Sequence, residues 1–391
     1  MSHSAPLSRR LWSSGVATFL VVGAFFVSCR PPTEKVDYTQ FNKGKLALRA
    51  VLSPVWRKRL TRHTYSPTRP EEFAGAEVSP DGETVWIGSS AKVLWALSKK
   101  TGTSLWKKDL PAPILAPPLY VAPRQRLYLG LADGCLYAIK TKNAEIDWKY
   151  CAKGLIYRRP AYRHGVVYFT NTQNYLYAID AETGKWRWSY DRALPEGFGI
   201  QGHAGPLVEG DRLYTGFADG YLVSLDARSG DVHWSRSLKG DAAEYVDVDS
   251  TPVLHDGVVY ASSQAGGVHA LTADMGALKW QYKTRGATGV ALSGDRVYFV
   301  SARKGIHCLT LEGKLVWRQD LDAGPVTKPW IHKDLVIFNT GRKGTYFINK
   351  KTGEYINRFN PGFGASAPIT FDDDHFFLFD NGGTFHHMRL H

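Results

Sequence analysis

Short runs of alternating apolar and polar side chains recur along this chain. Residues 176–188 read LYAIDAETGKWRW, and similar stretches occur at 94–106, 136–148, 222–234, 268–280 and 306–317. The alternation predicts β-strands, and the Thr-Gly step predicts a tight turn, because glycine adopts a positive φ without strain. A motif used this often predicts a repeated structural unit, so any function must be sought where the copies differ.

The complete unit contains four predicted strands. It begins with a Pro-containing entry such as GPLV or STPV, and the second strand carries an aromatic residue. Four short strands in a period of about 40 residues are typical of a β-propeller blade. We therefore predict an all-β fold, an eight-bladed β-propeller of four-stranded antiparallel blades. The aromatic of the second strand marks the eight copies at Trp86, Tyr128, Tyr168, Tyr214, Tyr260, Tyr298, Phe338 and Phe377.

A tryptophan recurs in the fourth strand, except in the seventh copy, where Asn357 takes its place. Residues 50–60 (AVLSPVWRKRL) look like an isolated fourth strand, whereas 366–391 supply only three strands. The N-terminal strand is therefore predicted to complete the last blade, which removes both open sheet edges. Each tryptophan is expected to cover about 150–250 Å² between neighbouring blades. The predicted structural tryptophans are Trp56, Trp106, Trp148, Trp188, Trp234, Trp280 and Trp317.

The N-terminal segment has the features of an export signal. Arg9 and Arg10 precede an apolar run that is too short for a comfortable transmembrane helix. The run ends in FVSC and resembles the lipobox of bacterial lipoproteins, with Phe26 where Leu is usual; an ordinary secretory signal is the alternative. We predict a signal peptide over 1–28, lipidation of Cys29, a polar tether over 29–45 and a propeller over 46–391. The resemblance implies an outer-membrane location facing the periplasm, because no Asp follows the cysteine.

The net charge of +13 looks dispersed along the sequence and indicates a solvated surface. One denser cluster over residues 57–63 either faces anionic lipid or is simply solvated. Nucleic acid is not an expected partner, because the chain is exported and shows no aromatic platform between basic residues. Cys135 and Cys151 flank a predicted hairpin, so in an oxidising compartment they either pair as a disulfide or remain two buried thiols.

No catalytic signature is present in the sequence. It contains no G-x-S-x-G, P-loop or H-E-x-x-H motif, no adjacent cysteines and no calcium-loop spacing of carboxylates. His269, His307 and His386 take the Tyr position of the third strand in three blades, so we expect them in the packing and not at a metal. We predict no enzyme activity, no cofactor and no metal site.

Two connections between predicted blades differ from the others. Residues 191–206 (DRALPEGFGIQGHAGP) are long and contain exposed apolar side chains, and residues 241–252 (DAAEYVDVDSTP) are acidic. Asp247 and Asp249 are two residues apart, so in an extended segment they share one side. They either solvate or cap the strand entry, or they form an acidic docking surface beside the apolar loop.

The D-A-x-T-G-K-x-x-W pattern at 180–188 resembles the repeat of pyrroloquinoline-quinone (PQQ) enzymes and of many non-enzymatic relatives. D-V-D-S-T-P followed by G-V-V-Y, and more loosely F-G-I-Q-G-H-A-G-P, resembles the BamB family of outer-membrane protein assembly factors. That resemblance implies a monomeric, lipid-anchored propeller that binds the POTRA domains of BamA, the barrel-inserting subunit. It assigns the binding to the residues matching Asp247, Asp249, Phe198, Ile200 and Gln201.

This chain departs from the family in the first loop. The family often has Arg where Gln201 stands, and Leu where Phe198 and Ile200 stand. The acidic loop matches better. Two other functions remain open from the sequence: a scaffold for another cell-envelope complex, and a periplasmic PQQ-dependent dehydrogenase or quinone-binding sensor.

Overall fold

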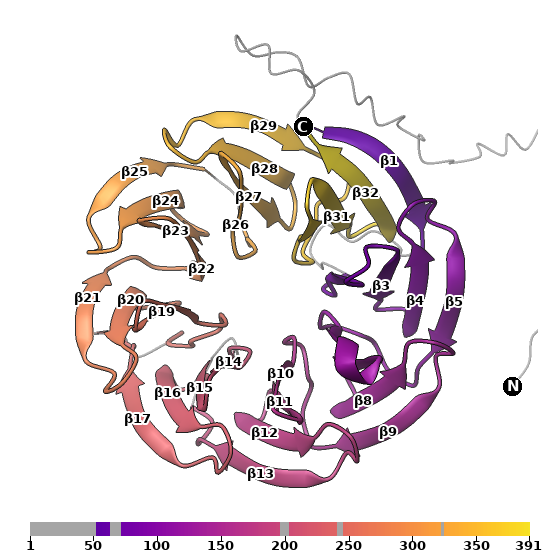
Figure 1. Cartoon of the computed structure of the whole chain (residues 1–391). Coiled ribbons are helices and arrows are strands. Elements are labelled where there is room, and N and C mark those ends of the chain that lie inside the picture. Colours follow the sequence, from indigo (N-terminus) through magenta and orange to yellow (C-terminus); the bar gives the residue numbers. More distant parts are fainter. Residues whose placement is uncertain (1–51, 63–71, 196–202, 241–244, 322–323) are drawn as a thin grey trace, which may run out of the picture. The chain divides into compact units, whose positions relative to one another are not determined.

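The computed structural model describes residues 52–62, 72–195, 203–240, 245–321 and 324–391. The predicted signal peptide, Cys29 and the tether lie outside the described residues, as do His63, Phe198, Ile200 and Gln201. The described chain forms eight four-stranded antiparallel sheets arranged as the blades of a ring (Figure 1). The predicted eight-bladed β-propeller is thus confirmed.

Each of the first four blades follows the chain from its inner strand to its outer strand. Blade 1 contains β2 (Ala76–Val78), β3 (Thr84–Gly88), β4 (Val93–Ser98) and β5 (Ser104–Asp109); blade 2 contains β6 (Leu119–Val121), β7 (Arg126–Gly130), β8 (Cys135–Lys140) and β9 (Ile146–Cys151), with a 3₁₀ turn η2 (Ala122–Arg124); blade 3 contains β10 (Ala161–Arg163), β11 (Val166–Thr170), β12 (Tyr175–Asp180) and β13 (Trp186–Asp191); blade 4 contains β14 (Leu207–Glu209), β15 (Arg212–Gly216), β16 (Tyr221–Asp226) and β17 (Val232–Ser237).

The second half of the ring repeats this order, and its last blade takes one strand from the N-terminal part of the chain. Blade 5 contains β18 (Val253–His255), β19 (Val258–Ser263), β20 (Gly267–Thr272) and β21 (Leu278–Tyr282); blade 6 contains β22 (Ala287–Ser293), β23 (Arg296–Ser301), β24 (Gly305–Thr310) and β25 (Leu315–Gln319); blade 7 contains β26 (Trp330–His332), β27 (Leu335–Thr340), β28 (Gly344–Asn349) and β29 (Tyr355–Phe359); blade 8 contains β30 (Thr370–Asp372), β31 (His375–Phe379), β32 (Thr384–Leu390) and β1 (Leu52–Arg59).

Ring closure depends on the pairing of β1 with β32. The two strands are antiparallel from Leu52 opposite Leu390 to Arg59 opposite Thr384, with a register shift between Pro54 and Trp56. Strand β1 is therefore the outer strand of blade 8, and β32 is not left as an open edge.

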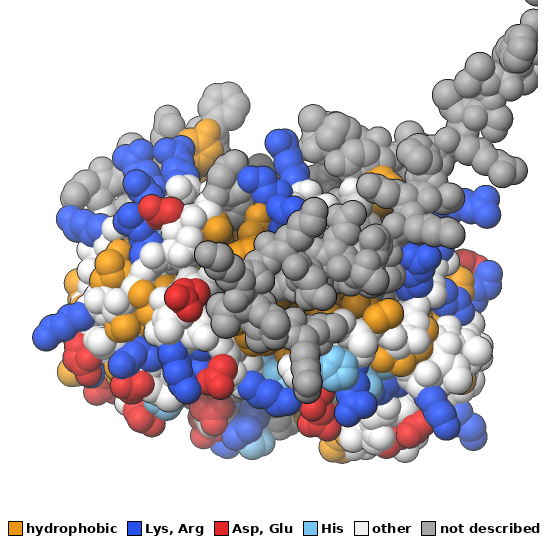
Figure 2. All heavy atoms as spheres, turned by 90° about the horizontal axis from the view of Figure 1, so that it is seen from above, with side chains coloured by type: hydrophobic (Ala, Val, Ile, Leu, Met, Phe, Trp, Pro, Cys, Tyr) orange, Lys and Arg blue, Asp and Glu red, His pale blue; other side chains and the backbone are white. Residues whose placement is uncertain are grey.

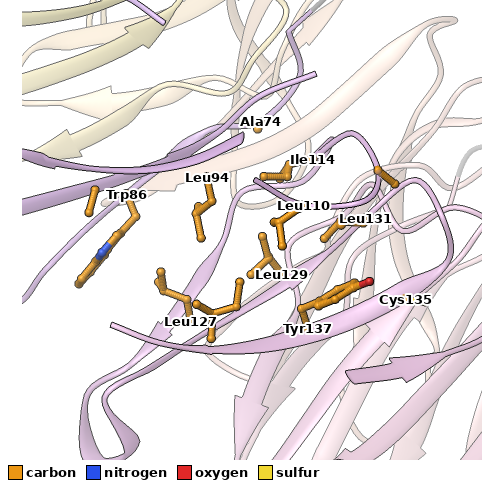
Figure 3. Packing of buried hydrophobic residues seen from close by; sticks show 13 residues of the cluster. Ala74, Trp86, Leu94, Leu110, Ile114, Leu127, Leu129, Leu131, Cys135 and Tyr137 are labelled. Carbon is orange, nitrogen blue, oxygen red and sulfur yellow. The ribbon is translucent and has the colours of Figure 1, made fainter. Parts of the chain in front are cut away.

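The core lies in the layers between adjacent blades. One cluster joins Trp86 and Leu94 of blade 1 to Leu127, Leu129 and Tyr137 of blade 2 (Figure 3). This follows from strand alternation, since one face of each blade meets the next blade across the ring. The hydrophobic interior is thus a series of inter-blade layers, each shared by two neighbouring blades.

The fourth-strand tryptophans lie at these interfaces. Trp188 donates a hydrogen bond from Nε1 to the carbonyl oxygen of Ala227 in blade 4, at 3.2 Å. The same bond runs from each of the other six to the third–fourth strand turn of the next blade, with N···O distances of 2.6–3.2 Å. Phenylalanines replace the tryptophan between blades 7 and 8, where Asn357 stands: Phe347 packs edge-on against Phe376.

The turn glycine is needed beneath each tryptophan ring. Gly184 has a φ of +70°, and a Cβ at that position would lie 2.7 Å from the ring of Trp148. Five other turns repeat this contact. The turn of blade 2 is the exception, because Ala144 occupies the corresponding position with a φ of 59°.

The topology gives the ring two different faces. One face, here called the connection face, carries the connections between blades together with the turns between second and third strands. The two kinds of segment touch: the amide of Gly341 donates to Pro325, and the amide of Ala302 donates to Gly286. The other face, here called the turn face, carries the first–second and third–fourth strand turns.

A disulfide joins Cys135 and Cys151, which are opposite each other on β8 and β9. The remaining described cysteine, Cys308, is buried in β24.

Candidate docking site

The acidic connection between blades 4 and 5 is extended around residues 246–249. Val246 and Val248 are buried. Val248 packs against Gly216 at the end of β15, where a Cβ would lie 2.2 Å from the valine Cγ1. Because side chains alternate in an extended segment, Asp247 and Asp249 are on the other side from the two valines.

Both aspartates face a partly enclosed polar cluster. Asp247 is 1% exposed. The Asp249 carboxylate accepts a hydrogen bond from Gln264 Nε2 at 2.8 Å, and its Oδ1 is buried without a hydrogen-bond partner in the described part of the chain. Burial raises the pKa of the Asp249 carboxyl, while Arg158 and Gln264 oppose the rise. Burial therefore disfavours the charged form of Asp249, and Arg158 and Gln264 offset this only in part.

The opposing side of the cluster comes from the connection between blades 2 and 3. Arg158 donates from Nε to the carbonyl oxygen of His203 at 2.8 Å, and its guanidinium lies 5.0 Å from the centre of the Tyr157 ring. The rings of Tyr157 and His203 are 4.3 Å apart. Burial raises the pKa of Tyr157. The charge of Arg158 lowers this pKa, and the charges of Asp249 and Asp247 raise it further.

Three connections converge closely at this place. A Cβ on Gly205 would lie 2.7 Å from Thr251 Oγ1 and 3.4 Å from the carbonyl oxygen of Arg159. A side chain at residue 205 would therefore require the Thr251 hydroxyl to move. We call the group formed by Tyr157, Arg158, His203, Asp247 and Asp249 the inter-connection cluster.

The sequence predicted that the two aspartates share one side of an extended segment. Asp247 is buried and Asp249 is half-buried, so they do not form an acidic surface open to solvent. Tyr157, Arg158 and His203 cover them, and the sequence gave no signal for these three residues, which come from two other connections. The aspartates are buried near Arg158 because the three connections converge there. The predicted residues of the first loop lie outside the described part of the chain.

The histidines at the third-strand Tyr position lie in separate blades. His307 stacks on Phe299 with ring centres 4.6 Å apart, and His386 bonds Asp380 at 2.8 Å. Burial lowers the pKa of His269 and of His307 to about 4 in each case. Within the described ranges, no group of three or more His, Cys, Asp or Glu side chains is arranged to hold a metal ion. Among the same residues, no helix has the length and apolarity needed to cross a membrane.

Taken together, the closed ring, the repeated inter-blade tryptophans and the inter-connection cluster define the class of eight-bladed propellers with PQQ-type repeats. The family model described as outer membrane protein assembly factor BamB matches residues 53–148, 90–312 and 264–356. The chain belongs to the BamB family.

Individual proteins agree with this assignment. The chain is 23% identical to BamB of Shewanella oneidensis over 298 residues, covering 71% of this chain and 75% of that protein. The crystal structure of BamB from Moraxella catarrhalis superposes with a TM-score of 0.75 at 18% identity, covering 87% of this chain and all of that one. A quinohemoprotein alcohol dehydrogenase from Pseudomonas putida superposes with a TM-score of 0.66 at 13% identity, covering 87% and 76% of the two chains. This last likeness shows a shared fold alone.

Proposed function

We propose that this protein is a non-catalytic scaffold of the outer-membrane barrel assembly machinery and docks on the POTRA domains of BamA. Membership of the BamB family is the observation that carries the proposal. In this proposal residues 1–28 are removed as a signal peptide, lipidated Cys29 anchors the chain in the outer membrane, and the propeller faces the periplasm on the tether over 29–45.

The connections over 191–206 and 241–252 are the proposed docking surface. Phe198, Ile200 and Gln201 are its proposed contacts on the first loop. In this proposal the acidic loop has a supporting role. Asp247 and Asp249, as members of the inter-connection cluster, hold the loop in place before the partner arrives. A preorganised loop loses less conformational entropy on binding than a mobile loop does. The affinity is higher for that reason.

The decisive experiment is calorimetry of the mature chain, residues 30–391, with the POTRA domains of BamA from the same organism. The variant is Asp247→Asn/Asp249→Asn, because asparagine preserves the size of the buried side chains while removing their charge. We expect at least a tenfold loss of affinity, since the charge of Asp249 interacts with Arg158 and both aspartates act on Tyr157 inside the cluster.

The matched control is Asp211→Asn/Asp256→Asn. Both residues are exposed in first–second strand turns of blades 4 and 5, on the turn face. If both variants lost the same affinity for the POTRA domains, the effect would come from the change in net charge and not from the cluster. Absence of binding by the wild-type protein would refute BamA docking and favour another envelope partner.

A further inference from the structure

The positive charge of this protein is concentrated on one face of three blades, although the sequence suggested that it is dispersed. On the connection face of blades 5–7, residues 264–266, 283–286, 302–304, 320–321, 324–329 and 341–343 contain seven Lys or Arg and one Asp. On the turn face of the same blades, residues 256–257, 273–277, 294–295, 311–314, 333–334 and 350–354 contain four Lys and six Asp or Glu. The reason is topological: successive turns of an antiparallel blade lie on opposite faces, so neighbouring charges in the sequence are separated in space.

Six of these cations form what we call the basic patch. They occur in three short stretches. The first two are linked through the backbone, since the carbonyl oxygen of Gly286 accepts from the amide of Ala302. The third joins the connection between blades 6 and 7, since the amide of Gly341 donates to the carbonyl oxygen of Pro325. The members are Lys283, Arg285, Arg303, Lys304, Arg342 and Lys343.

Four of the six cations in the basic patch have no ion-pair partner within the ranges that the structure describes, namely Arg285, Arg303, Lys304 and Arg342. The nearby Asp320 is paired with Arg318 at 2.8 Å. Ion pairs are frequent on the turn face, by contrast, as between Arg228 and Asp211 or Lys351 and Asp334. Figure 2 shows most acidic side chains of its view along the lower edge of the propeller, whereas Lys and Arg side chains lie along both edges.

Two observations describe the surroundings of the basic patch. First, the connection over 360–369 passes beside the patch, since a Cβ on Gly364 would lie 2.9 Å from the Arg342 Cα, and it carries Phe363, which is 40% exposed. The Phe363 ring lies against Gly382 of blade 8. An apolar side chain on a connection that borders Arg342 suits a polypeptide that carries both acidic and apolar groups.

Second, the described chain enters the propeller from the other face. Leu52 begins β1 opposite Leu390, whose amide donates to Asp374 in a turn-face turn. Strand β1 therefore begins at the turn face, and the basic patch is on the opposite, connection face.

We propose that the basic patch is a second docking surface, separate from the inter-connection cluster, and that it binds an acidic, extended polypeptide segment. Its binding should weaken strongly with salt, because exposed charges are screened over about 8–10 Å at physiological ionic strength.

The test measures fluorescence anisotropy of a labelled fifteen-residue peptide, rich in Asp and Glu with one Phe, mixed with residues 30–391, which contain every strand of the ring. The patch variant is Arg303→Gln/Lys304→Gln/Arg342→Gln. The control variant is Lys142→Gln/Lys185→Gln/Lys314→Gln, which removes the same charge from exposed third–fourth strand turns of the turn face. We expect at least a tenfold loss of affinity in the patch variant and less than a twofold change in the control.

Three outcomes would overturn the proposal: no peptide binding at low salt, equal loss in both variants, or patch-dependent sedimentation with phosphatidylglycerol vesicles in the absence of peptide binding. The last would assign the patch to anionic lipid. Asp247→Asn/Asp249→Asn should retain peptide binding, so failure of BamA docking and failure of this proposal are distinguished.

Discussion

At the scale of single residues, the Thr-Gly turn is fixed by the tryptophan above it. In Gly184→Ala, the new Cβ would meet the Trp148 ring at 2.7 Å, and the backbone has a φ of +70°. The left-handed conformation alone costs a non-glycine residue about 1–2 kcal/mol. We expect the free energy of unfolding, measured by chemical denaturation, to fall by at least that amount.

The reciprocal change supplies the control. Ala144 already has a φ of 59° at the corresponding position. Ala144→Gly relieves that strain at the expense of about 0.5–1 kcal/mol of backbone entropy, so it should be neutral or slightly stabilising. If Gly184→Ala were equally neutral, the turn would not be constrained by the ring.

Buried histidines should make the protein sensitive to mild acid. Burial lowers the pKa of His269 and His307 to about 4, and that of His387 to about 3. These groups are neutral in the folded protein but take up protons near pH 6.5 when unfolded. Their stabilising contribution is therefore complete above pH 6.5 and is lost progressively as the pH falls from 6.5 towards 4, by roughly 3 kcal/mol for each histidine.

Melting temperatures between pH 7.5 and 4.5 would measure this loss. His307→Phe keeps the stacking on Phe299 and should flatten the pH dependence, because one proton-binding group is removed. His233→Gln, in an exposed position on β17, should leave the dependence unchanged. A steep decline that His307→Phe does not reduce would contradict the assignment.

At the scale of strands, the tryptophan of β13 stabilises the interface between blades 3 and 4. Trp188 is 7% exposed and packs over Gly230, whereas Trp186 on the same strand is 54% exposed. Trp188→Ala should lower the free energy of unfolding by about 3–5 kcal/mol, as large-to-small core changes do. Trp186→Ala should change it by less than about 1 kcal/mol. The denaturant midpoints of the two variants measure this difference. If both variants lost a similar free energy of unfolding, the position of Trp188 at the blade interface would not be the reason for its effect.

The same scale shows how far the sequence could predict the molecule. Strand alternation and the repeated tryptophan predicted every blade, because both signals are local. They also predicted that Asp247 and Asp249 share a side. They could not predict what covers these aspartates, since Arg158 comes from a connection two blades earlier. The different charges of the two faces could not be predicted for a related reason. Turns that follow one another in the sequence lie on opposite faces of the ring, so their charges separate only in the folded structure.

At the scale of the whole molecule, the N-terminal strand closes the ring, and we expect the stability of the ring to depend on it. Strand β1 covers β32, which carries the buried Phe385 and Met388, and Trp56 donates from Nε1 to the carbonyl oxygen of Lys99 in blade 1 at 2.7 Å. Without β1, the edge of β32 is free to pair with another chain. A protein comprising residues 60–391 should therefore form oligomers, as measured by light scattering after gel filtration, whereas 46–391 should remain monomeric.

A peptide of residues 50–62 should restore the monomer when added to 60–391, because it supplies the missing strand and the Trp56 contact. The same peptide with Trp56→Ala should do so poorly, since it retains backbone pairing with β32 but loses the packing over Gly102, whose Cβ position lies 2.7 Å from the Trp56 ring. Equal rescue by both peptides would mean that backbone pairing alone closes the ring. A monomeric 60–391 with an unchanged melting temperature would mean that closure does not depend on β1, and that the contacts between blades 7, 8 and 1 are sufficient to hold the ring.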